Sequence, residues 1–394
     1  MKPLSEITTR FTESVIREMT RISNARGGVN LAQGFPDFDP PAEIRQAAIE
    51  AIHQGWNQYA VTFGEADLRE AITTKAFQYN RIDCDPHTEV TVTCGATEAM
   101  IATLKALVNP GDEVIIFEPF YENYGPDAIL SGAIPRYVTL RYPDWSYDST
   151  ELAAAFNENT KAIIINTPNN PTGKVFSRKE LEEIGRLCIQ WDALAITDEI
   201  YEHILYDQET HISMASLESM AQRTVTINSL SKTYSVTGWR VGWAIANADI
   251  TSRIRKVHDF LTVGAPTPFQ KAGVCALNMP GEYYTALQKR YENARNRVCT
   301  VLKAVGFNIE APKGAYYIMA QTAALMDRHN EAGADSFSLK LLDITGIATV
   351  PGTAFYHSPA MGRDQVRFCF AKNDSTIQDV CRRLEQLIPP SLKK

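Results

Sequence analysis

Lys232 is the residue of this chain best placed to do covalent chemistry. It follows the apolar, β-branched run Thr224–Ile227, so it is expected where a buried strand ends. Burial favours loss of the lysine's proton, and the free amine can form an imine with an aldehyde. Ser229, Ser231 and Arg240 lie close in sequence and could hold a phosphate. The combination predicts a site for pyridoxal 5′-phosphate (PLP), with an ordinary strand exit as the alternative.

Polar residues also follow two other apolar runs. Asn170 lies in a proline-rich turn after Ala162–Ile165 and could hydrogen-bond a phenolate oxygen, although a stiff loop would look the same. Asp198 follows Ala193–Ile196, and a carboxylate at the end of a buried strand needs a cationic or hydrogen-bonding partner. A pyridinium N–H would be such a partner, and Tyr201 could reach a ring hydroxyl. The alternative for Asp198 is an ordinary helix cap.

Three more features fit a phosphorylated, flat, carboxylate-bearing ligand. Gly95, Ala96 and Thr97 open a predicted helix, whose N-terminus favours an anion, although a tight strand-to-helix turn also needs small residues. Tyr121 follows the run at 113–117 and could stack on a ring, or simply pack. Arg367 is a single charge inside an apolar strand and matches a substrate carboxylate or an internal salt bridge.

The order of elements predicts how these residues meet. Short apolar runs alternate with helical patterns such as Thr97–Val108 and Ser177–Trp191, which is typical of a mostly parallel sheet in an α/β fold. Such sheets bind ligands outside the carboxyl ends of their strands. The candidate residues, each placed at a strand end, should therefore line one crevice.

The C-terminal part has a different pattern. A helix is expected over Tyr291–Val305, with short strands near Tyr316–Met319, Gly346–Val350 and Gln365–Cys369, and a final helix capped by Asp374 or Ser375. This pattern predicts a smaller α+β domain of residues 1–45 and 290–394, beside a large ligand-binding domain of residues 46–289.

Composition narrows the class of protein. The chain has 394 residues and a net charge of −7, which argues against nucleic-acid or anionic-membrane partners, and it has no apolar stretch of transmembrane length. Its seven cysteines are scattered and its first residues lack the apolar core of a signal peptide. A cytoplasmic protein with reduced thiols and no metal site is predicted.

Taken together, in this order and spacing, the motifs resemble the class I aminotransferases, which are PLP-dependent enzymes of fold type I. The resemblance covers essentially the whole chain and includes Gly34–Phe38, Asn57–Tyr59 with Phe63–Gly64, Pro312–Tyr317 and Arg367–Lys372. It is closest to the branch of kynurenine, glutamine–phenylpyruvate and methionine aminotransferases. The resemblance implies an α/β fold in which helices sandwich a mostly parallel sheet in the large domain.

The resemblance also implies roles for individual residues. Lys232 would be the imine-forming lysine and general base, Asp198 the partner of the pyridine nitrogen, and Tyr121 the stacking aromatic. Asn170 and Tyr201 would bind the ring hydroxyl. The phosphate would be held by Gly95, Ala96, Thr97, Ser229, Ser231, Arg240 and, from the neighbouring subunit of a homodimer, Tyr59. Arg367 would clamp the substrate α-carboxylate, helped by the Gly34 backbone and Asn170.

The implied reaction moves an amino group from an L-amino acid to a 2-oxo acid by a ping-pong mechanism. Thr97, Val263 and Gly264 stand where kynurenine-type enzymes carry larger aromatic or histidine side chains, which indicates a permissive pocket for methionine, glutamine, aromatic or similar amino acids. No second arginine is evident for a side-chain carboxylate, so aspartate is not favoured.

Two alternatives remain. The first is a PLP-dependent β-lyase of the cysteine-conjugate type on the same scaffold. The second is a non-catalytic PLP-binding regulator, which is disfavoured because no basic helix supplies a DNA-binding segment. A dinucleotide-dependent oxidoreductase is set aside, since no Gly-x-Gly-x-x-Gly opens a helix after a strand.

Overall fold

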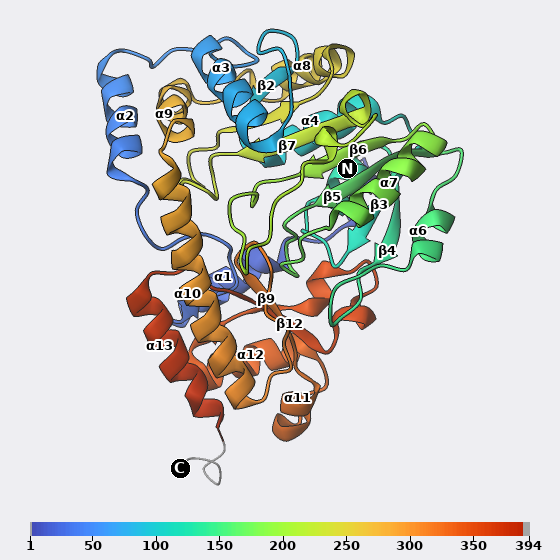
Figure 1. Ribbon diagram of the computed structural model, residues 1–394. Helices are drawn as coiled ribbons and strands as arrows, with labels where there is room; N and C mark the ends of the chain where they lie inside the picture. Colours follow the sequence, from blue (N-terminus) through green and yellow to red (C-terminus); the bar gives the residue numbers. More distant parts are fainter. Residues whose placement is uncertain (1, 389–394) are drawn as a thin grey trace.

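The computed structural model describes residues 2–388 and has two parts, one built around a large sheet and one around a small sheet (Figure 1). The predicted small domain also includes residues 1 and 389–394, which lie outside the described residues. No helix within residues 2–388 combines the length and the apolar character needed to cross a membrane.

The large sheet has seven strands in the order β2-β8-β7-β6-β5-β3-β4. The strands β3 to β7 pair in parallel, whereas β8 is antiparallel to both β7 and β2, so the predicted mostly parallel sheet is confirmed. The strands span Val90–Thr93 (β2), Glu113–Glu118 (β3), Ile134–Thr139 (β4), Thr160–Asn166 (β5), Leu194–Asp198 (β6), Thr224–Ser229 (β7) and Gly242–Ile245 (β8).

Helices cover both faces of this sheet because successive strand residues point to opposite sides. In β3, Ile115 faces a core that includes Leu181 and Ile184 of α7, whereas Val114 and Ile116 face the core that includes Leu104 of α4. The helices are Ala42–His53 (α2), Ala66–Lys75 (α3), Ala96–Leu107 (α4), Tyr124–Leu130 (α5), Ser149–Ala155 (α6), Arg178–Gln190 (α7), Ala248–Thr262 (α8) and Thr267–Leu277 (α9).

The small sheet has the order β11-β12-β9, with antiparallel pairing, and β1 pairs in parallel with β10. These strands span Val29–Asn30 (β1), Tyr317–Gln321 (β9), Ile347–Ala348 (β10), Val350–Pro351 (β11) and Gln365–Cys369 (β12). The single strand predicted over 346–350 is thus divided into two. Helices Val15–Ala25 (α1), Gly281–Val305 (α10), Ala323–His329 (α11), Ala334–Thr345 (α12) and Asp374–Leu384 (α13) accompany them.

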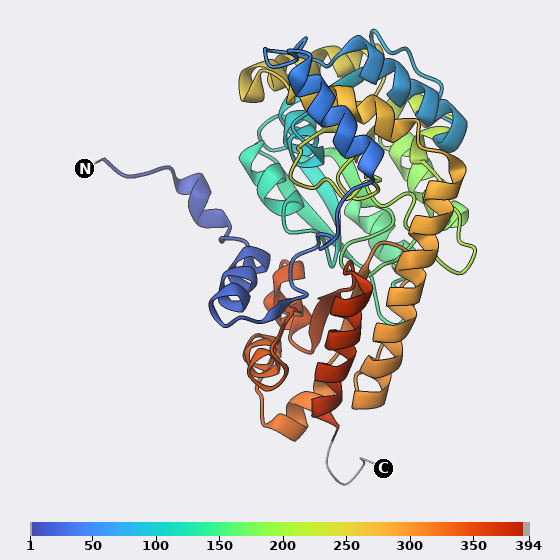
Figure 2. The ribbon, with the colours of Figure 1, turned by 90° about the vertical axis from the view of Figure 1, so that its left-hand side faces the viewer.

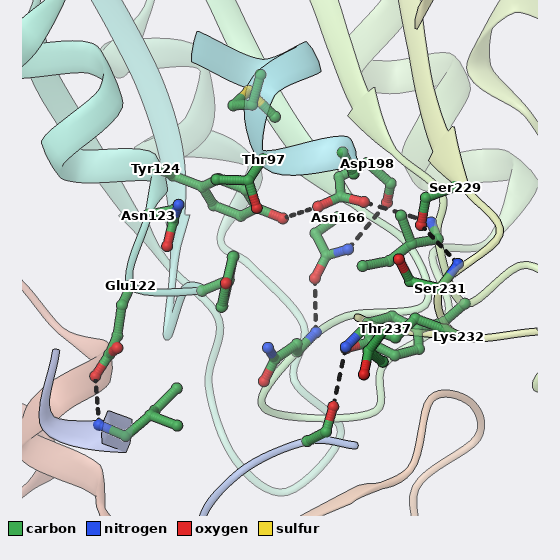
Figure 3. Close-up of a pocket in the computed structure, with 18 of the residues that line it drawn as sticks. Thr97, Glu122, Asn123, Tyr124, Asn166, Asp198, Ser229, Ser231, Lys232 and Thr237 are labelled. Atoms are coloured by element: carbon green, nitrogen blue, oxygen red, sulfur yellow. Dashed lines mark hydrogen bonds between the residues drawn. The ribbon is translucent and has the colours of Figure 1, made fainter. Parts of the chain in front are cut away.

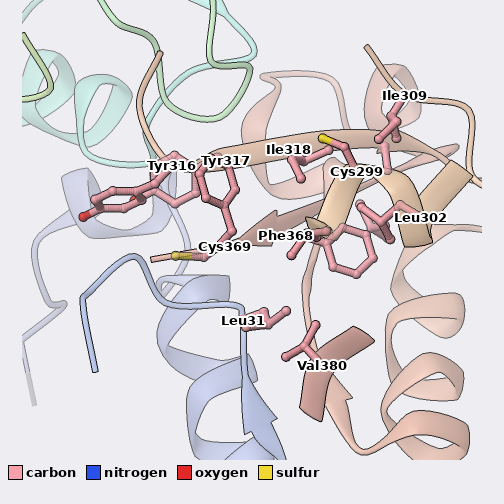
Figure 4. Close-up of a cluster of buried hydrophobic side chains, with 14 of the residues drawn as sticks. Leu31, Cys299, Leu302, Ile309, Tyr316, Tyr317, Ile318, Phe368, Cys369 and Val380 are labelled. Atoms are coloured by element: carbon pink, nitrogen blue, oxygen red, sulfur yellow. The ribbon is translucent and has the colours of Figure 1, made fainter. Parts of the chain in front are cut away.

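The small part has its own apolar core. Figure 4 shows Leu31, Leu302, Phe368 and Val380 meeting from the N-terminal segment, α10, β12 and α13, and all four are fully buried. The final helix is capped by Asn373, whose side chain accepts from the backbone N–H of Thr376, so the predicted cap at Asp374 or Ser375 is wrong by one or two residues.

The remaining helical segments are short. They are the 3-10 helices Glu6–Arg10, Met214–Ser216, Ala221–Arg223, Gly352–Phe355, Pro359–Gly362 and Glu385–Leu387, and a π-helical turn at Ala76–Asn80 that continues α3.

Helix α10 connects the two parts (Figure 1 and Figure 2). Figure 2 shows α10 running from the large part into the small part, where it lies beside α13. The predicted boundaries at 45/46 and 289/290 fall inside α2 and α10. We propose that the two-domain division holds with α10 as a shared element, and that the N-terminal segment belongs to the small domain because β1, at residues 29–30, pairs with β10.

Candidate active site

A cavity of about 990 Å³, which includes the solvent at its mouth, opens at the carboxyl ends of the large-sheet strands (Figure 3). Residues from the N-terminal segment, from both sheets and from α4 line it. Of the residues named from sequence, the following line this cavity: Gly34, Ala96, Thr97, Tyr121, Asn170, Asp198, Tyr201, Ser229, Ser231, Lys232, Arg240 and Arg367. Gly95 adjoins them, whereas Tyr59 lies elsewhere.

Lys232 follows β7, as its sequence position predicts. Its Nζ donates a hydrogen bond of 2.9 Å to the Gly34 carbonyl and lies about 6 Å from the ring centroids of Tyr201 and Tyr316. Burial is the main cause that lowers the pKa of Lys232 from 10.5 to about 8, and the nearby cations of Arg240 and Arg367 contribute to that lowering. About a tenth of the amine is therefore unprotonated near pH 7.

Asp198 is the last residue of β6 and is buried. One of its carboxylate oxygens accepts a 2.7 Å hydrogen bond from the Tyr124 hydroxyl, and the Asn166 amide donates to its main-chain carbonyl at 2.9 Å. Burial raises the pKa of Asp198 to about 6. Sequence reasoning missed Tyr124, because a tyrosine at the start of α5 gives no local sign of a partner 74 residues away.

The hydroxyls of Tyr201 and Tyr317 lie 3.0 Å apart at the base of the cavity. Tyr201 was expected there and Tyr317 was not. Asn170 lies on the other side of the binding region, where its main-chain N–H donates 2.7 Å to the Asn166 side chain. This bond fixes the turn, so the Asn170 side chain is held where its sequence position suggested.

Arg367, in β12, is fully buried. One guanidinium nitrogen donates 2.8 Å to Asn170 Oδ1, another donates 2.5 Å to the Ala32 carbonyl, and Nε has no hydrogen-bond partner. No carboxylate among residues 2–388 lies within 4.0 Å of it, so the internal salt bridge considered from sequence is not formed in the described chain.

The turn before α4 brings small residues against Arg240. Gly95 has a φ of +81°, and a Cβ there would lie 2.3 Å from a guanidinium nitrogen of Arg240. Arg240 in turn donates to the Cys94 and Thr237 carbonyls at 3.3 and 3.1 Å. The helix start, the missing Cβ and the guanidinium together make a cradle suited to an anion.

The rim of the cavity comes from α1 and the loop after β3. Glu122 accepts from the Ser14 hydroxyl at 2.5 Å and from the Ile16 main-chain N–H at 3.1 Å, which ties the start of α1 to this loop. Arg17, on the first turn of α1, also lines the cavity and has no carboxylate of residues 2–388 within 4.0 Å. No second arginine was evident from sequence for a side-chain carboxylate, and the structure adds Arg17 to the residues that line the cavity.

Tyr59 does not reach this cavity. Its side chain is 87% exposed, in the segment between α2 and α3.

A second group of buried acids lies behind the site and already holds a cation. Glu199, Glu202 and His211 have side-chain atoms within 4.8 Å of one another, but the ammonium of Lys75 contacts Glu202 and the amide of Asn80 donates to Glu202 at 2.7 Å. These bonds tie the end of α3 and the π-helical turn to the segment after β6.

Comparison with known proteins identifies the family. The family model described as "Aminotransferase class I and II" matches residues 26–384. The chain belongs to the class I and II aminotransferases. It is 37% identical over 390 residues to a probable N-succinyldiaminopimelate aminotransferase of Mycobacterium tuberculosis, covering 96% of each chain. It is 36% identical over 380 residues to the methionine aminotransferase of Escherichia coli, again covering 96% of each.

Solved structures agree with the family assignment. That of an N-succinyldiaminopimelate aminotransferase from Mycobacterium tuberculosis superposes with a TM-score of 0.93 at 36% identity, covering 98% of this chain and 100% of that one. The suspected branch is also confirmed, since a kynurenine–oxoglutarate transaminase of Dictyostelium discoideum is 35% identical over 408 residues, covering 95% and 94% of the chains. The protein is thus an aminotransferase of fold type I whose cofactor is PLP.

The lowered pKa of Lys232 predicts how covalent attachment of PLP to the PLP-free protein depends on pH. Only the unprotonated amine reacts, so the attachment rate should rise with pH and level off above about pH 8 rather than near 10.5. The rate can be measured by trapping with borohydride and quantifying the labelled Lys232 peptide by mass spectrometry. Exposed Lys179 in the same digests is the internal comparison. A Lys232 profile that is flat, or that follows Lys179, would contradict the prediction.

Proposed function

We propose that the cavity binds PLP and an amino acid together, with the roles that the sequence suggested. Its support is one observation: Lys232, Asp198 and Arg367 face the same cavity, and none of the three forms an ion pair within residues 2–388. Buried charges without partners are costly, so a ligand that supplies a cation to Asp198 and an anion to Arg367 would be strongly favoured. A pyridinium N–H and an α-carboxylate meet those needs.

The other groups fit the rest of the cofactor. The cradle of Gly95, Ala96, Thr97 and Arg240 suits the phosphate, with the hydroxyls of Ser229 and Ser231 beside it. Tyr121 would lie against the ring, while Tyr201 and Asn170 would donate to its hydroxyl oxygen. Bound PLP supplies an electron-withdrawing ring that takes up negative charge from the substrate Cα.

The chain's own residues supply binding, orientation and proton transfer. Lys232 Nζ accepts the substrate's Cα proton and returns it, because its lowered pKa keeps part of the amine neutral. Arg367, held by Asn170 and the Ala32 carbonyl, fixes the carboxylate so that the Cα–H bond points toward Lys232. Tyr124 holds the Asp198 carboxylate in place.

We further propose that the acceptor is a 2-oxo acid with a second carboxylate. Arg17 is a cation at the cavity mouth with no acidic partner within 4.0 Å among the described residues. The names of the relatives agree with such a ligand, since N-succinyldiaminopimelate and oxoglutarate each carry more than one carboxylate. Donors such as methionine or glutamine would use the same cavity without needing Arg17.

A homodimer with shared sites is also proposed. Exposed apolar side chains gather on two neighbouring segments, 56–63 and 260–264, which meet where Gly264 lies beside the Thr62 carbonyl. The most exposed are Tyr59, at 87%, and Phe260, at 91%. This patch adjoins the phosphate cradle, because the Cys94 thiol donates to the Gly264 carbonyl. A second copy of the chain would cover the patch and receive Tyr59 at its own cradle.

A cytoplasmic location is proposed as well. All seven cysteines are free, which suits a reducing compartment.

The reaction class is tested by the visible absorbance of the PLP-loaded protein. The wild type should lose its cofactor band on adding an amino-acid donor and regain it on adding a 2-oxo acid, whereas Lys232→Ala should keep its fold but lose nearly all turnover. Circular dichroism provides the folding control. Release of ammonia and pyruvate without an added oxo acid would favour the β-lyase, and full activity of Lys232→Ala would contradict the assigned role.

Substitution of Arg17 tests the acceptor. Arg17→Met should lower kcat/KM for 2-oxoglutarate about tenfold or more, because a charged hydrogen bond is lost, and should leave pyruvate within about twofold. Arg17→Lys is the matched control and should retain part of the preference. An equal fall for both acceptors would show that Arg17 only shapes the rim.

Mixed dimers test the sharing of Tyr59. A subunit carrying Lys232→Ala combined with one carrying Tyr59→Ala should form one intact site, since the working lysine then meets a tyrosine from the other chain. Equilibrium titration at limiting PLP should detect one tight site per hybrid dimer and none in the parent Tyr59→Ala dimer. If Tyr59 instead contacted the phosphate of its own subunit, the hybrid dimer would show no tight PLP site.

A further inference from the structure

A buried ion pair lies directly behind the phosphate cradle. Glu98, on the first turn of α4, and His258, on α8, are nearly fully buried, and Nδ1 of His258 lies 2.6 Å from Oε1 of Glu98. The two residues are 160 positions apart in the chain. Neither lines the cavity, so neither can touch the cofactor there.

The Glu98 carboxylate closes the cradle. Its Oε2 accepts a 2.5 Å hydrogen bond from the main-chain N–H of Cys94, so the side chain folds back from α4 to the residue that begins the turn. Its Oε1 also accepts from the Thr262 hydroxyl at 2.8 Å. The carboxylate thus accepts from two donors, and its Oε1 also lies 2.6 Å from Nδ1 of His258. The residues enclosed by this closure are Gly95, Ala96 and Thr97.

The geometry of His258 requires a proton on each ring nitrogen. Its Nε2 lies 2.7 Å from the Thr62 carbonyl oxygen, which can only accept. Its Nδ1 faces the Glu98 carboxylate, whose two oxygens already accept from the Cys94 N–H and the Thr262 hydroxyl. Burial disfavours the charged ring, but the hydrogen bond and charge of Glu98 outweigh it and raise the pKa of His258, and Asp259 adds to the rise. The raised pKa and the acceptors at both ring nitrogens favour the imidazolium form of His258 beside the Glu98 carboxylate.

Through Nε2 the pair also reaches the segment that carries Tyr59. Thr62 lies three residues beyond Tyr59, and the next residue, Phe63, accepts at its carbonyl from the N–H of Val92 in β2. His258 is therefore bonded at one ring nitrogen to the cradle and at the other to the Tyr59 segment.

We propose that Glu98 and His258 are a positioning pair for the cofactor phosphate, which holds the cradle of its own subunit and couples it to the segment that delivers Tyr59. The inference rests on the proposed PLP site and homodimer. A substitution that removes the imidazolium should loosen the cradle, and thus weaken binding of a phosphorylated ligand more than binding of the same ligand without its phosphate.

The test compares PLP with pyridoxal, which lacks the phosphate, in titrations of the PLP-free protein. His258→Asn should raise the Kd for PLP about tenfold or more and change that for pyridoxal less than about twofold, since a charge-assisted contact is lost only at the cradle. Glu98→Gln should behave in the same way. Thr262→Val is the matched control, because it removes one neutral bond to the same carboxylate and keeps the pair. Equal losses for both ligands, or no loss for PLP, would overturn the proposal.

A wild-type measurement covers the case in which the variants fail to fold. In PLP-free protein with ¹⁵N-labelled histidine, the His258 ring should keep two protonated nitrogens at pH values above the ordinary histidine pKa of 6.5, whereas a ring that is neutral there would refute the pair. The proposed function is judged separately: wild-type protein that binds PLP no better than pyridoxal would refute the phosphate site itself, whatever the variants do.

The link to Tyr59 is tested by a double-variant cycle. If His258 acts partly through Thr62, the effect of His258→Asn on the Kd for PLP should shrink at least about threefold in a Tyr59→Ala background. If the effects of the two substitutions on the Kd for PLP simply multiply, the coupling between His258 and the Tyr59 segment is refuted.

Discussion

The whole site depends on keeping three charges available to a ligand: those of the buried Asp198 and Arg367 and of the half-buried Lys232. Lys232, Asp198 and Arg367 line one cavity, yet each is held by a neutral partner rather than by one of the others. Lys232 donates to the Gly34 carbonyl, Asp198 accepts from the Tyr124 hydroxyl, and Arg367 donates to Asn170 and to the Ala32 carbonyl. Neutral partners offset part of the desolvation cost and leave most of each charge uncompensated. A ligand of complementary charge therefore gains more than it would at a site of closed salt bridges.

This arrangement explains why the N-terminal segment must thread between the two sheets. The Gly34 carbonyl accepts from Lys232 Nζ at 2.9 Å and from the Tyr316 hydroxyl at 3.0 Å. A Cβ at position 34 would lie 1.7 Å from the hydroxyl oxygen of Tyr317, so only glycine fits. Any larger residue would displace Tyr317 and, through it, the contact with Tyr201. A single glycine thus joins the lysine of the large domain to the tyrosines of the small one.

The sequence predicts those parts of the site whose signal is local. Asp198, Lys232 and Asn170 each follow an apolar run, and parallel topology then brings them to one edge of the sheet. Strand β4 was not predicted from sequence. It lies at the edge of the sheet, and most of its residues are exposed or half-exposed, so they do not form a continuous apolar run.

Hydrogen-bond partners that are distant in the chain cannot be predicted from sequence for a different reason. Tyr124 and Tyr317 matter through hydroxyl contacts with residues 74 and 116 positions away, and nothing near them in sequence marks those contacts. Arg17 looks like any exposed helical arginine until α1 is placed over the cavity.

The arginines that line the site also affect the pKa of Lys232. Burial is the main cause of its lowered pKa, and Arg240 and Arg367 contribute as uncompensated cations. A phosphate on Arg240 and a carboxylate on Arg367 would cancel much of that contribution, so the amine would become a stronger base once both anions are bound. The arginines that bind the ligands would thereby also control when the proton is transferred, while Arg17, which is exposed at the rim, can change substrate preference without affecting that step.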